Sequence, residues 1–330
     1  MTRYPACMTA GWLDDVRDPP SPVMLAQMAE SIVPGGRVVG LDRLGGGLGA
    51  ATHAFVLETA DRTQRRLVLR RYPRLALEED AGVAVRSWRT LQMLARYGVP
   101  APDPIWSDLE GNVFGTASYV TNHLPGDSDL RPRDLNLWVG GLANGLAGLH
   151  RTRFNQSDLS FLSGPAASLD RAFRRASQES ALAHPRAEIV QRVLAAWQPR
   201  LRKMAPVLCH GDYWAGNTLW HRGRMTAIVD WDEAMVGYPG IDAGYCRMDL
   251  ALQHGQDMAN DFLRAYESAA GMRIPQLHVW DLLGATVAMP DPERWLPGFH
   301  ELGRTDLTPA IVRERLAAFI DDALRRSGAA

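Results

Sequence analysis

Hydrophobic positions recur at helical spacing in residues 21–33 and then change to a shorter period. Three runs of residues follow a period close to two: 38–41, 53–57 and 66–70. That period is typical of strands with one buried face, and turn-forming residues separate the runs. The pattern therefore predicts a helix followed by an antiparallel meander of three strands.

The rest of the chain predicts one more helix, a second hairpin and then a helical half. An apolar stripe indicates a helix over residues 80–97, and residues 105–107 and 113–121 pair around a turn. Helical periodicity dominates after that, most clearly at 135–150, 190–201 and 309–328. We expect a small sheet in the N-terminal part and a mainly helical C-terminal part.

The length of 330 residues is more than one compact core usually supports, so two lobes are expected. The expected parts are a leader at 1–22, an N-terminal lobe at 23–121, a connecting segment at 122–126 and a C-terminal lobe at 127–330. The formal net charge of −1 gives no electrostatic reason to expect nucleic acid or an anionic membrane as partner. We expect a monomer or a homodimer.

The cysteines and the first residues bear on the cellular compartment. Cys7, Cys209 and Cys246 are odd in number and lack the spacing of metal ligands. Free thiols of this kind fit a reducing cytosol better than a disulfide framework. The start of the chain lacks the apolar core of a signal peptide, and no apolar run is long enough to span a membrane. We expect a cytoplasmic protein.

The strongest chemical signal lies in residues 208–217, Leu-Cys-His-Gly-Asp-Tyr-Trp-Ala-Gly-Asn. An apolar strand delivers the carboxylate of Asp212, a tight loop returns the amide oxygen of Asn217, and a second apolar run delivers Asp230. Hard oxygen ligands of this kind suit Mg²⁺ held together with substrate phosphates. The chemistry that needs such a site is phosphoryl transfer.

Three motifs resemble those of the aminoglycoside phosphotransferase and choline kinase group, small-molecule relatives of the protein kinases. They are H-G-D-x-x-x-x-N at 210–217, I-V-D-W-D at 228–232 and G-x-P-x-x-D at 237–242. The resemblance implies an α+β, two-lobed protein-kinase-like fold, with a small antiparallel-sheet N-lobe and a larger, mainly helical C-lobe. It also implies Mg²⁺-dependent transfer of the γ-phosphate of ATP or GTP to a hydroxyl of a small molecule, such as an aminoglycoside or macrolide antibiotic. A role in antibiotic resistance would follow for such an acceptor.

The resemblance and the residue types assign roles within these motifs. Asp212 is the candidate catalytic base that accepts the proton of the acceptor hydroxyl, and Asn217 and Asp230 are the candidate metal ligands. His210 is expected to brace the loop through hydrogen bonds rather than to take part in the chemistry. Asp242 is expected to cap the next helix and to accept backbone N–H bonds from the catalytic loop.

Glycines cluster in the first turn of the predicted sheet, at Gly45, Gly46, Gly47 and Gly49. They would let the backbone come close to a phosphate, although an ordinary hairpin loop is an equal alternative. No Lys follows, which excludes a P-loop, and the loop precedes a strand, which argues against a dinucleotide fold. The resemblance implies a glycine loop over the nucleotide at this first hairpin.

Arg70 stands where the resembled family has a Lys that grips the nucleotide phosphates. Alternation along the strand places Val68 and Arg70 on one face, and an arginine can engage two phosphate oxygens at once. The alternative is a solvated surface arginine. By the same resemblance the base is expected near Thr121, Asn122 and His123, where the family has its hinge. A plain exit from strand to loop is the alternative there.

The helix expected at 80–97 departs from the family, where it supplies a Glu that pairs with the strand Lys. Ser87 occupies the matching position, so either Glu78 or Glu79 reaches Arg70 or the pair is missing. This departure keeps open a catalytically weak nucleotide-binding regulatory module of the same fold. A metal-dependent hydrolase is less favoured, because the histidines form no H-E-x-x-H or H-x-H cluster.

The acceptor site is expected in the helical region after Asp242. That region contains acidic and aromatic residues, at Asp249, Asp257, Asp261, Glu267, Asp281, Asp291, Glu293, Trp280, Trp295 and Phe299. Acids would suit a cationic sugar and aromatics a bulky hydroxylated compound, while a solvated helix face is the alternative for each acid. Asp232 is either an additional carboxylate of the site or an exposed loop acid. His150 is expected to be a packed or capping residue rather than a ligand.

Overall fold

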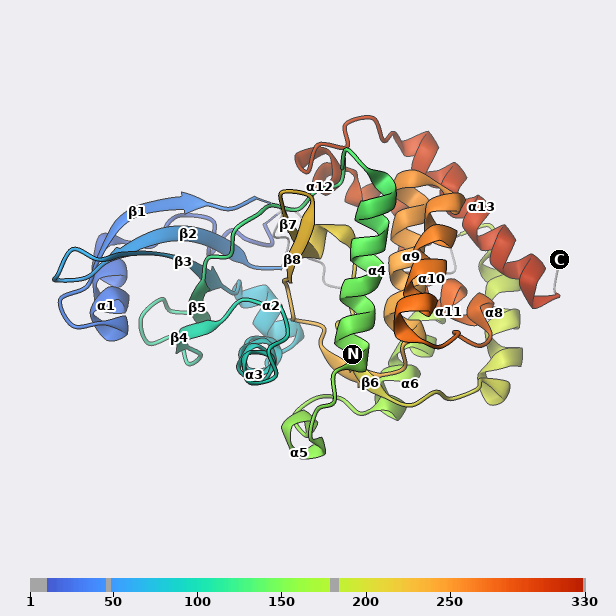
Figure 1. The fold of residues 1–330 in the computed structure, drawn as a ribbon, viewed down its shortest axis with the longest axis horizontal. Coiled ribbons are helices and arrows are strands. Elements are labelled where there is room, and N and C mark those ends of the chain that lie inside the picture. The colour runs from blue at the N-terminus through green and yellow to red at the C-terminus, as the bar shows by residue number, and fades with distance from the viewer. Residues whose placement is uncertain (1–10, 46–48, 179–183, 329–330) are drawn as a thin grey trace. The chain divides into compact units, whose positions relative to one another are not determined.

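The chain divides into two compact units, Met1–Pro125 and Gly126–Ala330, in a computed structural model that describes residues 11–45, 49–178 and 184–328 (Figure 1). The elements of the first unit are α1 (Pro22–Ile32), β1 (Arg37–Arg43), β2 (Ala51–Glu58), β3 (Gln64–Arg71), α2 (Arg74–Glu79), α3 (Val83–Arg96), β4 (Pro104–Asp108) and β5 (Ser118–Asn122). The dividing point falls inside the segment that was expected to connect the lobes.

Most helices belong to the second unit. Its elements are α4 (Leu135–Arg151), α5 (Gln156–Leu159), α6 (Pro165–Ala176), α8 (Ala187–Trp197), η1 (Gln198–Arg200), β6 (Val207–Cys209), η2 (Ala215–Asn217), β7 (Thr218–His221), β8 (Arg224–Ile228), β9 (Met235–Gly237), α9 (Gly240–His254), α10 (Gln256–Ala270), α11 (Leu277–Ala288), η3 (Pro292–Trp295), α12 (Leu296–Glu301) and α13 (Pro309–Ser327). The expected α+β class is confirmed, with a small antiparallel sheet in one unit and a mainly helical other unit.

The sheet of the first unit has five antiparallel strands in the order β1-β2-β3-β5-β4. The predicted meander is its first half. In the register of β3 against β5, Arg70 lies opposite Tyr119 and Val68 lies opposite Thr121. Side chains of directly paired residues point to the same side of a sheet. Val68, Arg70 and Thr121 therefore share one face.

Helix α1 covers the opposite face of this sheet. Its residues Met28 and Ala29 join Phe55, Leu69 and Val120 in one buried apolar cluster. Ser21 begins the helix as N-cap, its hydroxyl accepting a hydrogen bond from the amide of Met24, as expected. The α1 face is thus filled by hydrocarbon, and the face that carries Arg70 is the one left for polar groups.

The helix expected at 80–97 begins later, at Val83, because residues 74–79 form a separate helix, α2. Asp80 ends α2, and its carboxylate accepts hydrogen bonds from the Gly82 amide at 3.0 Å and from Arg86 at 2.7 Å. These bonds hold residues 80–82 as a link between the two helices. Ala95, expected on the apolar stripe, is exposed.

The strand expected at 113–121 begins only at Ser118. The buried carboxylate of Asp108 accepts hydrogen bonds from the amides of Asn112, Val113 and Phe114 at 2.7, 2.8 and 3.2 Å. An aspartate that satisfies three consecutive amides stabilises a turn. These residues therefore stay in the turn instead of extending the strand.

The described part of the leader packs closely on the first unit. Trp12 and Val16 are buried. Arg71 donates hydrogen bonds to the carbonyl oxygens of Val16 and Asp18 at 2.7 and 2.5 Å. Of these two consecutive arginines, Arg71 is thus committed to the leader, and Arg70 points to the other face.

In the second unit, helix α9 lies at the centre and packs against α10, α11 and α13, while α10 also packs against α4 (Figure 1). A buried ion cluster joins three of these helices. Arg247 of α9 donates to Asp281 of α11 at 2.9 and 3.1 Å, and Arg326 of α13 donates to the same carboxylate at 2.7 Å. Asp281, an expected acceptor-site candidate, is therefore part of the helix packing.

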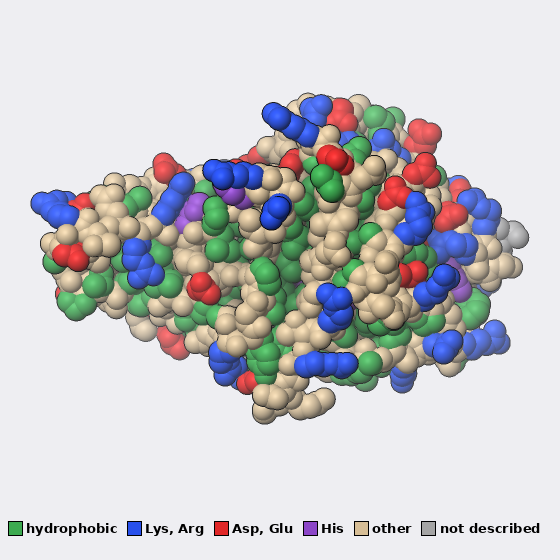
Figure 2. Space-filling model, viewed as in Figure 1, with side chains coloured by type: hydrophobic (Ala, Val, Ile, Leu, Met, Phe, Trp, Pro, Cys, Tyr) green, Lys and Arg blue, Asp and Glu red, His purple; other side chains and the backbone are tan. Residues whose placement is uncertain are grey.

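The surface carries both signs of charge. Basic and acidic side chains lie on the visible face of each unit in Figure 2, in keeping with a formal net charge of −1. Across the described parts of the chain, every helix is too short or too polar to pass through a bilayer.

Candidate active site

The loop after β6 is fastened to helix α9 by Asp242. Its carboxylate, which is fully buried, accepts hydrogen bonds from the amides of His210 and Gly211, both at 2.8 Å, and from Nε2 of His150 at 3.0 Å. Burial alone would raise the pKa of Asp242, but the bond and charge of His150 bring it below its usual value. Gly211 has φ +85°, and a Cβ there would collide with the carbonyl oxygen of Glu233.

Asp242 ties the loop as expected, but it does not cap α9. Pro239 occupies the N-cap position of that helix, and no side chain caps it. Both carboxylate oxygens of Asp242 are taken by the loop amides and by His150. The carboxylate therefore serves these loop amides and not the first turn of its own helix.

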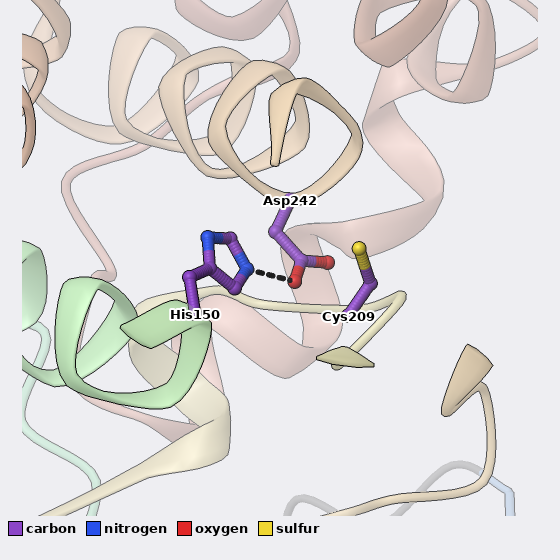
Figure 3. Close-up of side chains that lie close together, drawn as sticks. All are labelled: His150, Cys209 and Asp242. Carbon is purple, nitrogen blue, oxygen red and sulfur yellow. Dashed lines mark hydrogen bonds and ion pairs between the residues drawn. The ribbon is translucent and has the colours of Figure 1, made fainter. Parts of the chain in front are cut away.

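His150, Cys209 and Asp242 lie close together in a buried cluster (Figure 3). The imidazole of His150 is hydrogen-bonded through both nitrogens, to Asp242 and to the Tyr266 hydroxyl at 2.8 Å. The thiol of Cys209 faces the Tyr238 carbonyl at 3.5 Å, and burial raises its pKa. A metal ligand would need a thiolate and a free imidazole nitrogen. The cluster is therefore a structural brace under the loop.

His210 holds the loop to the β7–β8 hairpin. Its Nε2 donates to the Val229 carbonyl at 2.9 Å, and its Nδ1 accepts from the Asp212 amide at 3.3 Å. Burial lowers the pKa of His210, which fits this neutral tautomer. The charges of Asp230 and Asp232 act on the same imidazole, so both acids lie nearby.

Asp212 projects from this loop with its carboxylate held on two sides. Asn217 donates through Nδ2 to the Asp212 backbone oxygen at 2.9 Å and to Oδ2 at 3.0 Å. Burial raises the pKa of Asp212 to about 6, and the charge of Glu233 adds to the rise. Hydrogen bonds from Tyr245 and Asn217 and the charge of Arg175 oppose it. The result is a carboxylate whose basicity is close to neutral pH, as proton acceptance requires.

Asn217 and Asp230 are brought together by the β7–β8 hairpin. Thr218 pairs with Ile228, and the Val229 amide donates to the Asn217 carbonyl at 2.9 Å. Asp230 follows Val229 with φ +64°, a left-handed conformation that Asp tolerates better than most residues. The hairpin therefore places residues 217 and 230 at the same end of its two strands.

These two side chains fit a hard divalent cation. The Nδ2 atom of Asn217 faces two acceptor oxygens of Asp212, which leaves its Oδ1 as the atom available to a cation. Asp230, at the same end of the hairpin, carries a carboxylate. An amide oxygen and a carboxylate form the kind of sparse protein ligand set that Mg²⁺ shares with phosphates and water.

The expected nucleotide residues of the first unit lie at β3 and β5. The guanidinium of Arg70 stands 5.4 Å from the Tyr72 ring centroid. The amides of Asn122 and His123 donate to the carbonyls of Asp103 and Arg66, so a base held here would have to be read by other groups. Of the four glycines, Gly45 and Gly49 border the turn, while Gly46 and Gly47 lie outside the described residues.

Ser87 is fully buried, and its hydroxyl lies 3.0 Å from the Tyr119 hydroxyl. It is committed to the packing of α3 on the sheet. Glu78 is exposed and Glu79 is half-buried, both on α2, which directly follows β3. Of the two acids, Glu79 is the less exposed.

Sequence reasoning missed the role of Tyr245, which hydrogen-bonds Asp212, and listed Asp249 only among many acids. Tyr245 and Asp249 lie three and seven residues after Asp242, positions that share one face of a helix. That spacing from Asp242 is the signal that could have found them. A second missed feature is Trp214, whose ring packs edge-on against Phe299 at 6.0 Å.

Several known proteins are similar to this chain. A family model described as "Phosphotransferase enzyme family" matches residues 44–278. Mouse acyl-CoA dehydrogenase family member 10 is 23% identical over 208 residues, which are 60% of this chain and 19% of that protein. The chain thus spans about a fifth to a quarter of the length of the curated relatives it matches.

Solved structures share the fold at low sequence identity. A putative aminoglycoside phosphotransferase from Ralstonia eutropha JMP134 has a TM-score of 0.67, 18% identity, and coverage of 93% of this chain and 99% of that chain. A macrolide 2'-phosphotransferase from Brachybacterium faecium has a TM-score of 0.57 and 20% identity, and the match covers 89% of this chain and 97% of that chain. A thermostable mutant of an aminoglycoside phosphotransferase, in a ternary complex with ADP and hygromycin B, has a TM-score of 0.56 and 16% identity. That match covers 93% of this chain and 99% of that chain. These likenesses confirm the expected fold.

Proposed function

Because this chain belongs to the phosphotransferase enzyme family, we propose that it is a small-molecule kinase that transfers the γ-phosphate of ATP or GTP to a hydroxyl group of its acceptor. The family match confirms the resemblance that the three motifs indicated. The proposal extends to the nucleotide, to Mg²⁺ and to the acceptor class. A ternary complex of one similar protein with ADP and hygromycin B supports nucleotide use and a hydroxylated acceptor.

The observation that carries the proposal is the environment of Asp212. Its carboxylate is oriented by Asn217 and Tyr245 and has a pKa of about 6. A base in phosphoryl transfer must line up the acceptor hydroxyl and take its proton late in the reaction. A fixed carboxylate that is mostly ionised at neutral pH meets both needs.

Asn217 and Asp230 would hold Mg²⁺, which when bound neutralises charge on the phosphates. His210 and Asp242 keep these residues in place by bracing the loop from below. On the first unit, Arg70 and the glycines of the first turn would bind the nucleotide phosphates, and Val68 would contact the nucleotide on the same face. The segment at Thr121, Asn122 and His123 would lie near the base.

A screen with γ-labelled ATP and GTP against hydroxylated small molecules tests this function. Labelled product that depends on Mg²⁺ is expected with wild-type protein. Asp212→Asn should lower kcat by orders of magnitude while the fold persists, and Asn217→Ala and Asp230→Asn should first weaken the dependence on Mg²⁺. Asp170→Asn, an exposed acid of α6 in the same unit, serves as the matched control.

The alternatives give other results in the same screen. A regulatory module would bind nucleotide without labelling any acceptor. A metal-dependent hydrolase would release phosphate without an acceptor and would need imidazole ligands, yet both nitrogens of His150 and of His210 are engaged in hydrogen bonds. An antibiotic acceptor and a cytoplasmic location remain part of the proposal, the latter supported by the free thiols Cys209 and Cys246; Cys7 lies outside the described residues.

A further inference from the structure

The leader contacts the first unit at the corner where β3 ends and α2 begins. The guanidinium of Arg71 donates hydrogen bonds to the carbonyl oxygens of Val16 and Asp18 at 2.7 and 2.5 Å. Three residues further along the chain, the Arg74 amide donates to Oδ2 of Asp15 at 2.8 Å. This corner is therefore held by a segment that lies 53 to 59 residues earlier in the sequence.

Asp15 gives α2 a cap that the helix does not have of its own. Pro73 occupies the N-cap position, and no side chain of the helix start makes a capping bond. Helix α2 has six residues, and none of them is buried. A helix this short is not stable by itself, and without buried side chains it gains little from packing. The bond between Asp15 and the Arg74 amide therefore matters more here than a cap does on a long, buried helix.

The other face of the same corner carries the arginine proposed to bind the nucleotide phosphates. The guanidinium of Arg70 stands 5.4 Å from the ring centroid of Tyr72. Tyr72 is 0% exposed, and its ring lies 6.0 Å from the ring of Tyr119, which is paired with Arg70 across the sheet. Because Tyr72 comes two residues before Arg74, a displacement at the start of α2 also moves the ring that Arg70 contacts.

We propose that Asp15 is a positioning residue for nucleotide binding. By capping α2, the leader keeps the corner between β3 and α2, and with it Arg70, in the conformation that binds phosphates. This inference rests on the proposed function, because it takes Arg70 as a phosphate-binding residue. Without the cap, a fraction of the molecules has α2 displaced and is not competent to bind. The apparent dissociation constant of the nucleotide then rises by the reciprocal of the competent fraction.

Three variants separate the capping bond from the charge of the carboxylate. Asp15→Ala removes the acceptor oxygen, and the dissociation constant of the nucleotide should rise about fivefold. Asp15→Asn keeps an oxygen for the Arg74 amide, and Asn caps helices as well as Asp does, so this variant should bind nucleotide like the wild type. Asp14→Ala is the matched control, because the carboxylate of Asp14 is also exposed and pairs with Arg17 inside the leader.

Two measurements report the two halves of the inference. Equilibrium binding of ATP and of GTP in the presence of Mg²⁺ measures nucleotide affinity and needs no acceptor. Hydrogen exchange of the amides at 74–79 measures the stability of α2 and should be faster in Asp15→Ala alone. In the labelling assay, the nucleotide KM should rise with the dissociation constant, while kcat and the acceptor KM stay at the control values. Thermal denaturation establishes that each variant folds.

The positioning role is overturned if Asp15→Ala binds nucleotide within twofold of Asp14→Ala. It is also overturned if Asp15→Asn loses as much affinity as Asp15→Ala, because the charge and not the cap would then be responsible. An equal rise in the nucleotide and acceptor KM values would show a general loss of structure and would contradict it as well.

Failure of the proposed function gives a different result. Wild-type protein would then bind nucleotide but label no acceptor, and the comparison of nucleotide affinities among the three variants would still decide the role of Asp15. Wild-type protein that binds neither ATP nor GTP would overturn both the proposed function and the positioning role.

Discussion

Replacement of Asp242 by Asn should separate the anchoring of the catalytic loop from the chemistry of Asp212. The Asp242 carboxylate accepts hydrogen bonds from the amides of His210 and Gly211 and from Nε2 of His150. Asparagine has nearly the same shape, but it offers one oxygen and places an NH₂ group where the other oxygen was. Wherever the NH₂ points, at least one buried donor faces another donor.

The size of the effect follows from the bonds involved. The least damaging orientation keeps the oxygen toward the His210 amide and Nε2 of His150, because two of the three bonds then survive, and gives up the bond from the Gly211 amide. Loss of one charge-assisted hydrogen bond at a fully buried site lowers the free energy of unfolding by about 1.5–3 kcal/mol. The released amide lies next to Asp212, and a misplacement of about 1 Å at a reacting group lowers kcat about 100-fold.

Urea unfolding and acceptor phosphorylation measure the two quantities on one preparation. We expect the Asp242→Asn midpoint to fall with an unchanged m-value, and kcat to fall about 10–100-fold with a smaller change in the nucleotide KM. Asp170→Asn, with an exposed carboxylate in α6, should alter neither. A variant with wild-type kcat would refute the argument that Asp242 positions Asp212, and an unfolding free energy within about 0.5 kcal/mol of wild type would refute the assigned bonds.

Three further outcomes are expected. The folded protein binds the Asp212 proton more tightly than the unfolded chain, so its stability falls as pH rises from about 4 to about 6. In urea denaturation at pH 7.5, Asp212→Asn should therefore have a free energy of unfolding about 1–3 kcal/mol higher than wild type. Near pH 4 the two free energies should be equal. Tyr245→Phe removes a bond that lowers the pKa of Asp212, so the acidic limb of kcat/KM should move up by about one pH unit, and an unmoved limb would exclude that bond. Gly216→Ala drives a methyl group into the Trp214 ring, so it should lower the free energy of unfolding by about 1–3 kcal/mol and reduce kcat. The control is Gly148→Ala in α4, whose methyl group meets open space and should leave thermal stability unchanged or raise it.

The catalytic loop could be predicted from the sequence because its chemistry is local. Asp212, Asn217 and Asp230 lie within 19 residues, and the hairpin that joins them is encoded by two apolar runs and a short turn. The hydrogen-bonding role of Asp242 was accessible for the same reason. Its expected helix cap was wrong, because local propensity favours Asp at a helix start while two buried loop amides compete for the same carboxylate.

The parts that escaped prediction depend on contacts that the local pattern does not encode. Helix α2 has only six residues, too few to show a period. The late start of β5 depends on Asp108, which draws the following residues into a turn. Helix α9 is buried on nearly all sides, so no polar face marks which of its residues meet the catalytic loop. The bonds from Asp242 to the loop set which face of α9 points toward the loop, and Tyr245 lies on that face.

Asp242 of α9 and Asp212 of the adjoining loop have pKa values that are shifted in opposite directions. Burial pushes the pKa of both Asp242 and Asp212 upward. The pKa of Asp242 nevertheless falls below its usual value, because two loop amides and His150 all donate hydrogen bonds to its carboxylate. The pKa of Asp212 stays raised, because its carboxylate accepts fewer hydrogen bonds and lies near the negative charge of Glu233. The number of hydrogen-bond donors to each carboxylate therefore decides its role. Asp242, which has more donors, stays ionised and holds the loop, and Asp212, which has fewer, keeps the basicity to accept a proton near neutral pH.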